Sequence, residues 1–152
     1  MQESNCMKLE LLTRVIINKS DYGLIEYLPE IPCLRIVRTG FQLSSEIQEG
    51  CNAILTFLQQ REPGSKISLL YDLEEGEPML EEDLQWIAEE WKPQVVALGV
   101  KHVAVVPPQK EFGQLSVDVI REAMKSSQAS TTDQYFPDNE SALEWLQNVL
   151  SH

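Results

Sequence analysis

This chain is poor in positively charged residues, and that scarcity limits its partners. It has 12 Lys and Arg against 24 Asp and Glu, which gives a formal net charge of -12 at pH 7. Binding through counterion release requires clustered Lys and Arg, so this balance argues against a nucleic-acid partner. An anionic membrane surface would repel the same charge. We therefore expect no nucleic acid and no membrane among its partners.

Long apolar runs, paired cysteines and glycine-rich loops are also missing. No run of about 18 apolar residues occurs, and no basic segment followed by an apolar one opens the chain. The three cysteines show no C-x-x-C spacing, which is typical of reduced thiols in a cytosol. The seven glycines are dispersed, so neither G-x-G-x-x-G nor a P-loop is present. We expect a cytoplasmic protein without a cofactor.

What the chain does contain is the pattern of one α/β domain. At 152 residues and 43% hydrophobic residues it can bury a core. An apolar strand at 67–70 that ends in Tyr71-Asp72, a helix and an apolar strand at 102–106 form one right-handed βαβ crossover. Residues 24–28 and 33–39 read as an antiparallel hairpin, and 9–18 fit a strand slightly better than a short helix. We expect a single domain over 1–152, with 1–6 mobile.

Helical spacing of apolar residues completes the expected fold. It predicts helices over about 45–58, from about 81 with a kink or break at Pro93, over 116–125, and after a capping Asp138. Residues 131–136 read as a short edge strand. The predicted fold class is α/β, with a mixed four- to five-stranded sheet, an N-terminal antiparallel hairpin and about four flanking helices.

The strand ends supply the candidate site residues. Ligands of open α/β sheets usually lie beyond the carboxyl ends of the strands, which here include Thr39, Asp72 and Pro107. Asp72 is the best-placed polar residue. It could bind a divalent cation together with Glu74 or Glu75, or accept a phosphoryl group. Asp also commonly directs a turn, and we favour that structural role.

The acidic stretch that follows favours neither a metal site nor catalysis. Nine carboxylates and no Lys or Arg lie between Asp72 and Glu90. Their register does not match a calcium loop, and two histidines make zinc unfavourable. A helix start that complements the macrodipole explains them better. His102 and Cys51 fall in apolar elements, so we expect them to be structural, with no catalytic residue and no metal.

The remaining signals concern tryptophan and arginine. Trp86 and Trp145 are offset from the apolar stripes of their helices, so each is either a binding anchor or part of a wide buried face. Arg35 and Arg38 are three positions apart in a strand and therefore cannot face the same side.

The pattern from about residue 9 to 150 resembles the STAS-like domains, named for sulfate transporters and anti-sigma-factor antagonists. Within them, it is similar to uncharacterised single-domain bacterial proteins. The resemblance implies a mixed sheet flanked by helices and a role in protein–protein regulation. The residues that carry it are the opening hairpin, Tyr71-Asp72, 83–87, 90–93, 97–106, 135–138 and 142–146.

The resemblance also implies a regulatory site that this chain lacks. In anti-sigma-factor antagonists of this fold, a Ser or Thr at the start of the helix after the third strand is phosphorylated to break a partner contact. Residues 72–83 here contain no Ser or Thr. We favour a branch that never used this switch over an acidic loop that mimics the phosphorylated state.

Two functions from different classes follow. The favoured one is a non-enzymatic regulatory or protein-interaction domain of STAS-like type, whose partner is another protein with a basic surface. A homodimer through the edge strand is a further option. The alternative is a small-molecule-binding or phosphoryl-transfer protein that uses Asp72 at a strand end. The candidate ligand or partner surface comprises Thr39, Asp72, Glu74, Glu75, Trp86 and Pro107.

Overall fold

One six-stranded sheet organises the protein. The computed structural model describes residues 8–62, 64–77, 79–108 and 131–150. The sheet order is β1-β2-β3-β4-β5-β6; β1, β2 and β3 pair antiparallel, and β3 to β6 pair parallel. The strands are β1 Val15–Ser20, β2 Gly23–Leu28, β3 Cys33–Gly40, β4 Ser68–Gly76, β5 His102–Val106 and β6 Thr132–Tyr135.

The mixed α/β class and the antiparallel hairpin are therefore confirmed, and the strand count is corrected from four or five to six. Residues 9–18, for which a strand was slightly favoured over a short helix, divide between a short 3-10 helix, η2 Leu9–Leu11, and the start of β1. The expected edge strand at 131–136 is present as β6, parallel to β5. The helix expected at 116–125 and the mobile segment expected at 1–6 lie outside the described residues.

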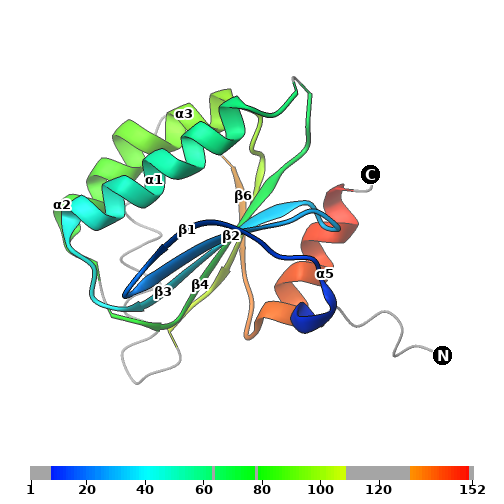
Figure 1. Cartoon of the computed structure of the whole chain (residues 1–152), viewed down its shortest axis with the longest axis horizontal. Coiled ribbons are helices and arrows are strands. Elements are labelled where there is room, and N and C mark those ends of the chain that lie inside the picture. The colour runs from blue at the N-terminus through cyan, green and yellow to red at the C-terminus, as the bar shows by residue number, and fades with distance from the viewer. Residues whose placement is uncertain (1–7, 63, 78, 109–130, 151–152) are drawn as a thin grey trace.

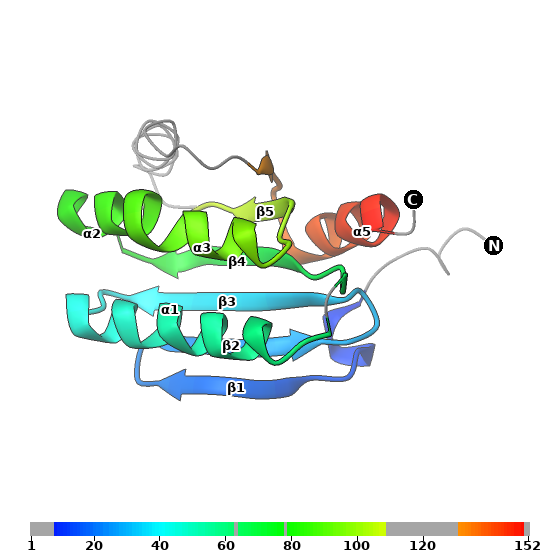
Figure 2. The same ribbon diagram turned by 90° about the horizontal axis from the view of Figure 1, so that it is seen from above.

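The helices form a layer on each side of the sheet. α1 Ser44–Gln59 lies beside a second helical stretch made of α2 Glu81–Trp86, the π-helical η3 Ile87–Trp91 and α3 Lys92–Ala97. α5 Asn139–Leu150 covers the opposite face (Figure 1). Seen from above, α1 runs along β2 and β3, while α2 and α3 run along β4 and β5 (Figure 2). Within the described ranges, no helix is long and apolar enough to cross a bilayer.

Each face of the sheet has its own apolar core. The α1–α3 face packs residues of alternate strand positions, such as Ile25, Leu34 and Leu69, against the helices. The α5 face packs the intervening positions, such as Cys33 and Leu70, against α5. This division follows from the two-residue period of a strand, which sends neighbouring side chains to opposite faces.

The helix that contains Pro93 continues through it, where the sequence predicted a kink or a break. In a regular α-helix a proline ring clashes with the carbonyl group four residues earlier. The π-helical turn Ile87–Trp91 ends two residues before Pro93 and widens the helix at the carbonyl groups that the proline ring would otherwise meet. α3 ends at Ala97, and Gly99 follows shortly after with a positive φ of 107°, a conformation that glycine adopts readily after a helix.

Trp91 connects this helix to α1. Its side chain is 2% exposed, and its indole Nε1 donates to the carbonyl oxygen of Cys51 at 2.9 Å. We expect Trp91→Phe to lower the free energy of unfolding by about 1–3 kcal/mol, because it removes both volume and a buried hydrogen bond. Urea unfolding measures the change. Trp145→Phe, at a half-buried site on the other face, should cost less; equal losses would contradict this role for Trp91.

Candidate functional site

Glu74 and Glu75 lie inside strand β4, which continues past the end that the sequence predicted. β4 runs to Gly76, whereas the sequence predicted that it would end at Asp72. The pairing of β3 and β4 shifts register here, because two steps along β3, from Val37 to Thr39, match three steps along β4, from Asp72 to Glu75. The last residues of both strands pair beyond this point. Asp72 is the Cα partner of Val106, the last residue of β5. Asp72 therefore lies at the end of β5 but in the middle of β4.

Arg35 joins three strands and a helix on the α5 face. Its Nη1 donates to Oε2 of Glu26 at 2.8 Å, and its Nη2 donates to Oδ2 of Asp72 at 2.6 Å. Its Nε donates to Oδ1 of Asn139, the first residue of α5, at 2.9 Å. Arg14 binds the second oxygen of Glu26 at 2.9 Å. Glu26, Arg35 and Asp72 are 1%, 7% and 6% exposed, so these charges are paired inside the protein.

Both carboxylate oxygens of Asp72 are already bonded to the protein. Oδ2 accepts from Arg35 and, at 3.0 Å, from Nδ2 of Asn139. Oδ1 accepts from the backbone N–H of Glu74 at 3.3 Å. Among the described residues, no group of three or more His, Cys, Asp or Glu side chains is placed to hold a metal ion. This environment favours the structural role for Asp72.

Glu74 lies beside the same cluster. Asn139 donates through Nδ2 to its Oε2 at 3.1 Å. Partial burial raises the pKa of Glu74 above its ordinary value, and the negative charges of Asp72 and Glu75 raise it further. Arg35 opposes this shift.

The other expected surface residues are spread over the domain. Thr39 is the Cα partner of Glu75 across β3 and β4. Trp86 packs against the core of the α1–α3 face, on the other side of the sheet from Asp72. Pro107, half-buried, follows β5.

Trp145 is likewise half-buried, with its ring 5.8 Å from that of His102 and 5.5 Å from that of Phe136. The two offset tryptophans therefore belong to the edges of the two cores.

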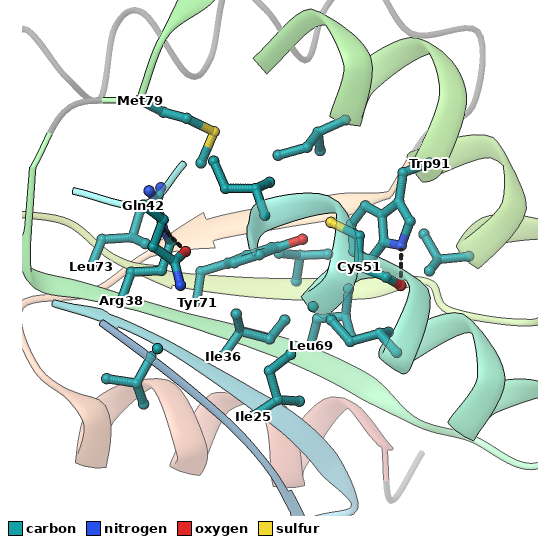
Figure 3. A pocket seen from close by; sticks show the side chains of 18 of the residues that line it. Ile25, Ile36, Arg38, Gln42, Cys51, Leu69, Tyr71, Leu73, Met79 and Trp91 are labelled. Carbon is teal, nitrogen blue, oxygen red and sulfur yellow. Dashed lines mark hydrogen bonds between the residues drawn. The ribbon is translucent and has the colours of Figure 1, made fainter. Parts of the chain in front are cut away.

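A cavity lies on the α1–α3 face, between the sheet and the helices (Figure 3). Its volume is about 180 Å³. Tyr71 and Cys51 extend toward each other within it. Most of its wall is apolar, including Ile25, Ile36, Leu69, Leu73, Met79 and Trp91.

Polar side chains gather near one end of this cavity. Arg38, which lines it, donates from Nε to Oε1 of Gln42 at 2.9 Å. Asp83, next to the lining residue Leu84, accepts at Oδ1 from the hydroxyl of Ser44 at 2.7 Å. Nη2 of Arg38 and Oδ2 of Asp83 are buried and have no hydrogen-bond partner in the part of the chain that the structure describes.

These two unpartnered atoms belong to oppositely charged side chains, and the charge of Asp83 acts on the pKa of Arg38. Arg38 is 7% exposed and Asp83 is 5% exposed. Burial lowers the pKa of Arg38, and the negative charge of Asp83 opposes that shift. A buried polar atom without a partner costs about 1–3 kcal/mol. Arg38 lines the cavity and could offer Nη2 to a polar group there, whereas Asp83 is not among the lining residues.

The cavity is suited to binding rather than to covalent chemistry. Burial raises the pKa of the Cys51 thiol to about 12, and it also raises the pKa of Tyr71 well above its usual range. Both groups are therefore neutral near pH 7, and the thiolate, not the thiol, is the nucleophile. On the α5 face, burial raises the pKa of Cys33 in the same way.

The size of the cavity has an energetic consequence. At about 24 cal/mol per Å³, an empty, closed cavity of about 180 Å³ would cost about 4 kcal/mol. That is a large part of the roughly 5–15 kcal/mol that stabilises a typical domain. This cavity is not closed, because exposed residues such as Ser20 and Glu49 belong to its lining, so water can occupy it when no ligand is bound.

Sequence reasoning missed most of these residues, although one signal was available. Glu26 stands within the apolar strand 24–28, and Arg35 and Arg38 stand within 33–39. Because a buried charge is costly unless it is paired, a charge at such a position predicts a partner on a neighbouring strand. Tyr71 and Asp83 gave no comparable signal for the cavity.

No protein-family model and no curated protein matches this chain. Among solved structures, it is similar to an uncharacterised protein of the DUF3478 family from Shewanella loihica PV-4, described as having a SpoIIAA-like fold. The match covers 92% of this chain and 98% of the other, at 19% identity and a TM-score of 0.48. At this identity and TM-score, the likeness gives no argument about function.

Removing Arg35 tests the buried charge cluster. Arg35→Met should lower the free energy of unfolding by about 3–5 kcal/mol, because Glu26 and Asp72 would remain buried without their shared cation. Arg14→Met is the matched control, since the Arg14 side chain is 41% exposed and should contribute about 1 kcal/mol or less. Urea unfolding gives both values, and equal losses would contradict the central position of Arg35.

Glu74 gives a pH-dependent prediction. Because its pKa is raised in the folded protein, the folded state keeps this proton longer than the unfolded state as the pH rises above its ordinary value of 4.5. Ionised Glu74 is therefore destabilising at neutral pH. We expect Glu74→Gln to raise Tm at pH 7 and to lose this advantage below about pH 4.5, where the proton is bound in both states.

Thermal unfolding across this pH range measures the effect of Glu74→Gln. Glu75→Gln removes the same charge from the exposed neighbour and should give a smaller gain. A lower Tm for Glu74→Gln at pH 7 would show that the contact with Asn139 requires the charge.

Proposed function

We propose that this chain is a non-enzymatic binding domain of STAS-like type, and that it takes a small amphipathic molecule between its sheet and helices α1 to α3. One observation carries the proposal: an apolar cavity of about 180 Å³ is lined at one end by Arg38, whose buried guanidinium group has an unpartnered nitrogen among the described residues. Ligand sites commonly combine such an apolar wall with a few convergent polar groups.

The cavity sets the size of the ligand. An engineered apolar cavity of about 150 Å³ takes up benzene. A volume of about 180 Å³ therefore suits a molecule of the size of a substituted benzene ring or a short branched chain. The apolar part of such a ligand would lie against Leu69 and Trp91, with its polar part toward Arg38.

The location of Asp72 weighs against the phosphoryl-transfer part of the alternative function. Asp72 lies on the α5 face, where Arg35 and Asn139 bind its carboxylate. The small-molecule part of that alternative is retained, at a different site. The neutral Cys51 and Tyr71 give the cavity itself no nucleophile.

A protein partner with a basic surface stays a prediction from the sequence. Four exposed apolar side chains near the starts of α1 and α2 support it: Tyr22, Phe41, Leu43 and Leu80. The exposed Glu81 and Glu82 follow in the first turn of α2. Residues of the same helices line the cavity, so a ligand bound there would affect the positions of these exposed side chains.

Filling the cavity tests the proposed function. A saturating apolar ligand such as toluene should raise the Tm of the unmodified protein by several degrees, since a ligand at a hundred times its Kd stabilises by about 2.7 kcal/mol. Cys51→Met should remain folded, because its longer side chain enters existing space. It should also abolish the response to toluene. Thermal unfolding with and without toluene measures both effects.

Cys33→Met is the matched control. Cys33 is 0% exposed in the core of the α5 face, so a longer side chain there should destabilise the protein by about 1–3 kcal/mol and leave the response to toluene intact. No response in the unmodified protein, or the same response in Cys51→Met, would refute the proposed site.

A further inference from the structure

The charged side chains that line the cavity differ in burial according to their sign. The two cations, Arg38 and Lys92, are 7% and 8% exposed. The carboxylates are less buried: Glu46 is half-buried, while Glu49 and Asp133 are exposed to solvent. Solvent screens exposed charges. Among the described residues, the buried part of the wall therefore carries positive charge, although the chain has a formal net charge of -12.

Neither of these two buried cations has a counter-charge from the protein. The ion pairs found within the described residues involve neither Arg38 nor Lys92. Nε of Arg38 donates to the uncharged amide of Gln42, and Nη2 is buried without a partner in the same part of the chain. Since a buried charge is costly unless it is paired, an anion bound at Arg38 would relieve a cost that the folded protein carries.

The charge of Arg38 acts inside the cavity, where Tyr71 and Cys51 extend toward each other (Figure 3). Burial raises the pKa of both groups, and the positive charge of Arg38 opposes that rise. The negative charge of Asp83 also acts on Arg38, but Asp83 does not line the cavity and does not bond to Nη2. Nη2 therefore keeps its donors for a group bound in the cavity.

We propose that the ligand of this cavity carries a carboxylate, and that Arg38 binds this carboxylate through Nη2. The inference rests on the proposed function and adds the charge and chemical class of the polar end of the ligand. An ionised carboxylate offers only acceptors and a guanidinium nitrogen only donors, and hydrogen bonds between such charged groups are about twice as strong as neutral ones. Folding has already removed Arg38 from water, so binding adds only the desolvation of the ligand.

Uncharged and cationic polar ends fit this site less well. A primary amide presents a carbonyl oxygen to Nη2 but leaves the positive charge of Arg38 without a counter-charge. An ammonium group has no acceptor, and both Arg38 and Lys92 would repel it. The proposed site therefore predicts an order of affinity in which a carboxylate comes first, an amide second and an ammonium group last.

A binding series in which only the polar end changes tests this order. Toluene, benzyl alcohol, benzamide, benzoate and benzylamine share one ring, and isothermal titration calorimetry at pH 7 gives their Kd values. We expect benzoate to bind most tightly, about tenfold or more tightly than benzamide, which has a similar shape without the charge. Benzylamine should bind more weakly than toluene, because its ammonium group would meet a positively charged wall.

Arg38→Met identifies the residue that binds the carboxylate. It keeps an apolar side chain in the wall and removes the charge, so the ratio of benzoate to toluene affinity should fall about tenfold or more. Arg61→Met is the matched control, because Arg61 is exposed and does not line the cavity. It should leave the ratio unchanged. The series on the unmodified protein decides the preference even if Arg38→Met does not fold.

The outcomes separate this inference from the proposed function. If toluene binds but benzoate binds no more tightly than benzamide, the cavity is a ligand site and its preference for a carboxylate is refuted. Tightest binding of benzylamine would refute it as well. An unchanged ratio in Arg38→Met refutes the role of Arg38. If none of the five binds, the proposed function itself fails.

Discussion

The guanidinium group of Arg35 lies at the centre of one face of the sheet and bonds to side chains from three other elements. Glu26 on β2, Asp72 on β4 and Asn139 at the start of α5 meet at this group. The charges of Glu26, Arg35 and Asp72 depend on one another, since a buried charge without a counter-charge costs several kcal/mol. Their mutual dependence fixes the alignment of β2, β3 and β4 and the point where α5 meets the sheet. On the α5 face, these buried charges are therefore paired and the apolar side chains beside them pack against α5.

The opposite face is built differently. Arg38, three residues further along β3, faces α1 and α2 with one nitrogen bonded to Gln42 and another without a partner among the described residues. Asp83 is near enough to influence it but does not pair with it. Each guanidinium nitrogen of Arg35 has a hydrogen-bond partner, whereas Nη2 of Arg38, beside the apolar cavity, has none among the described residues. The contrast between these two arginines of one strand separates the part of the domain that maintains the fold from the part that is available to a ligand.

Sequence reasoning predicted elements that depend on local pattern. The hairpin, the βαβ unit, the edge strand β6 and the opposite orientation of Arg35 and Arg38 follow from the two-residue and 3.6-residue periods. The cap on α5 is also confirmed, since Oδ1 of Asp138 accepts from the N–H of Ser141 at 2.8 Å. Features that depend on tertiary contacts were missed. β4 extends past Asp72 and pairs with β3 to its end, with one extra residue in β4 that shifts the register. The helix continues through Pro93 after a π-helical turn. The cavity depends on how side-chain volumes from several elements fit together, and the strand and helix periods of the sequence do not reveal this.

The most direct test of the account is a crystal structure of the protein under xenon pressure. Xenon enters apolar cavities and is visible as strong electron density. The account predicts xenon between Leu69, Trp91 and Tyr71 on the α1–α3 face, and none within the ion-paired and closely packed α5 face. A closed α1–α3 core that takes up no xenon, with Arg38 paired to Asp83, would contradict the ligand site and leave only a structural role for both arginines.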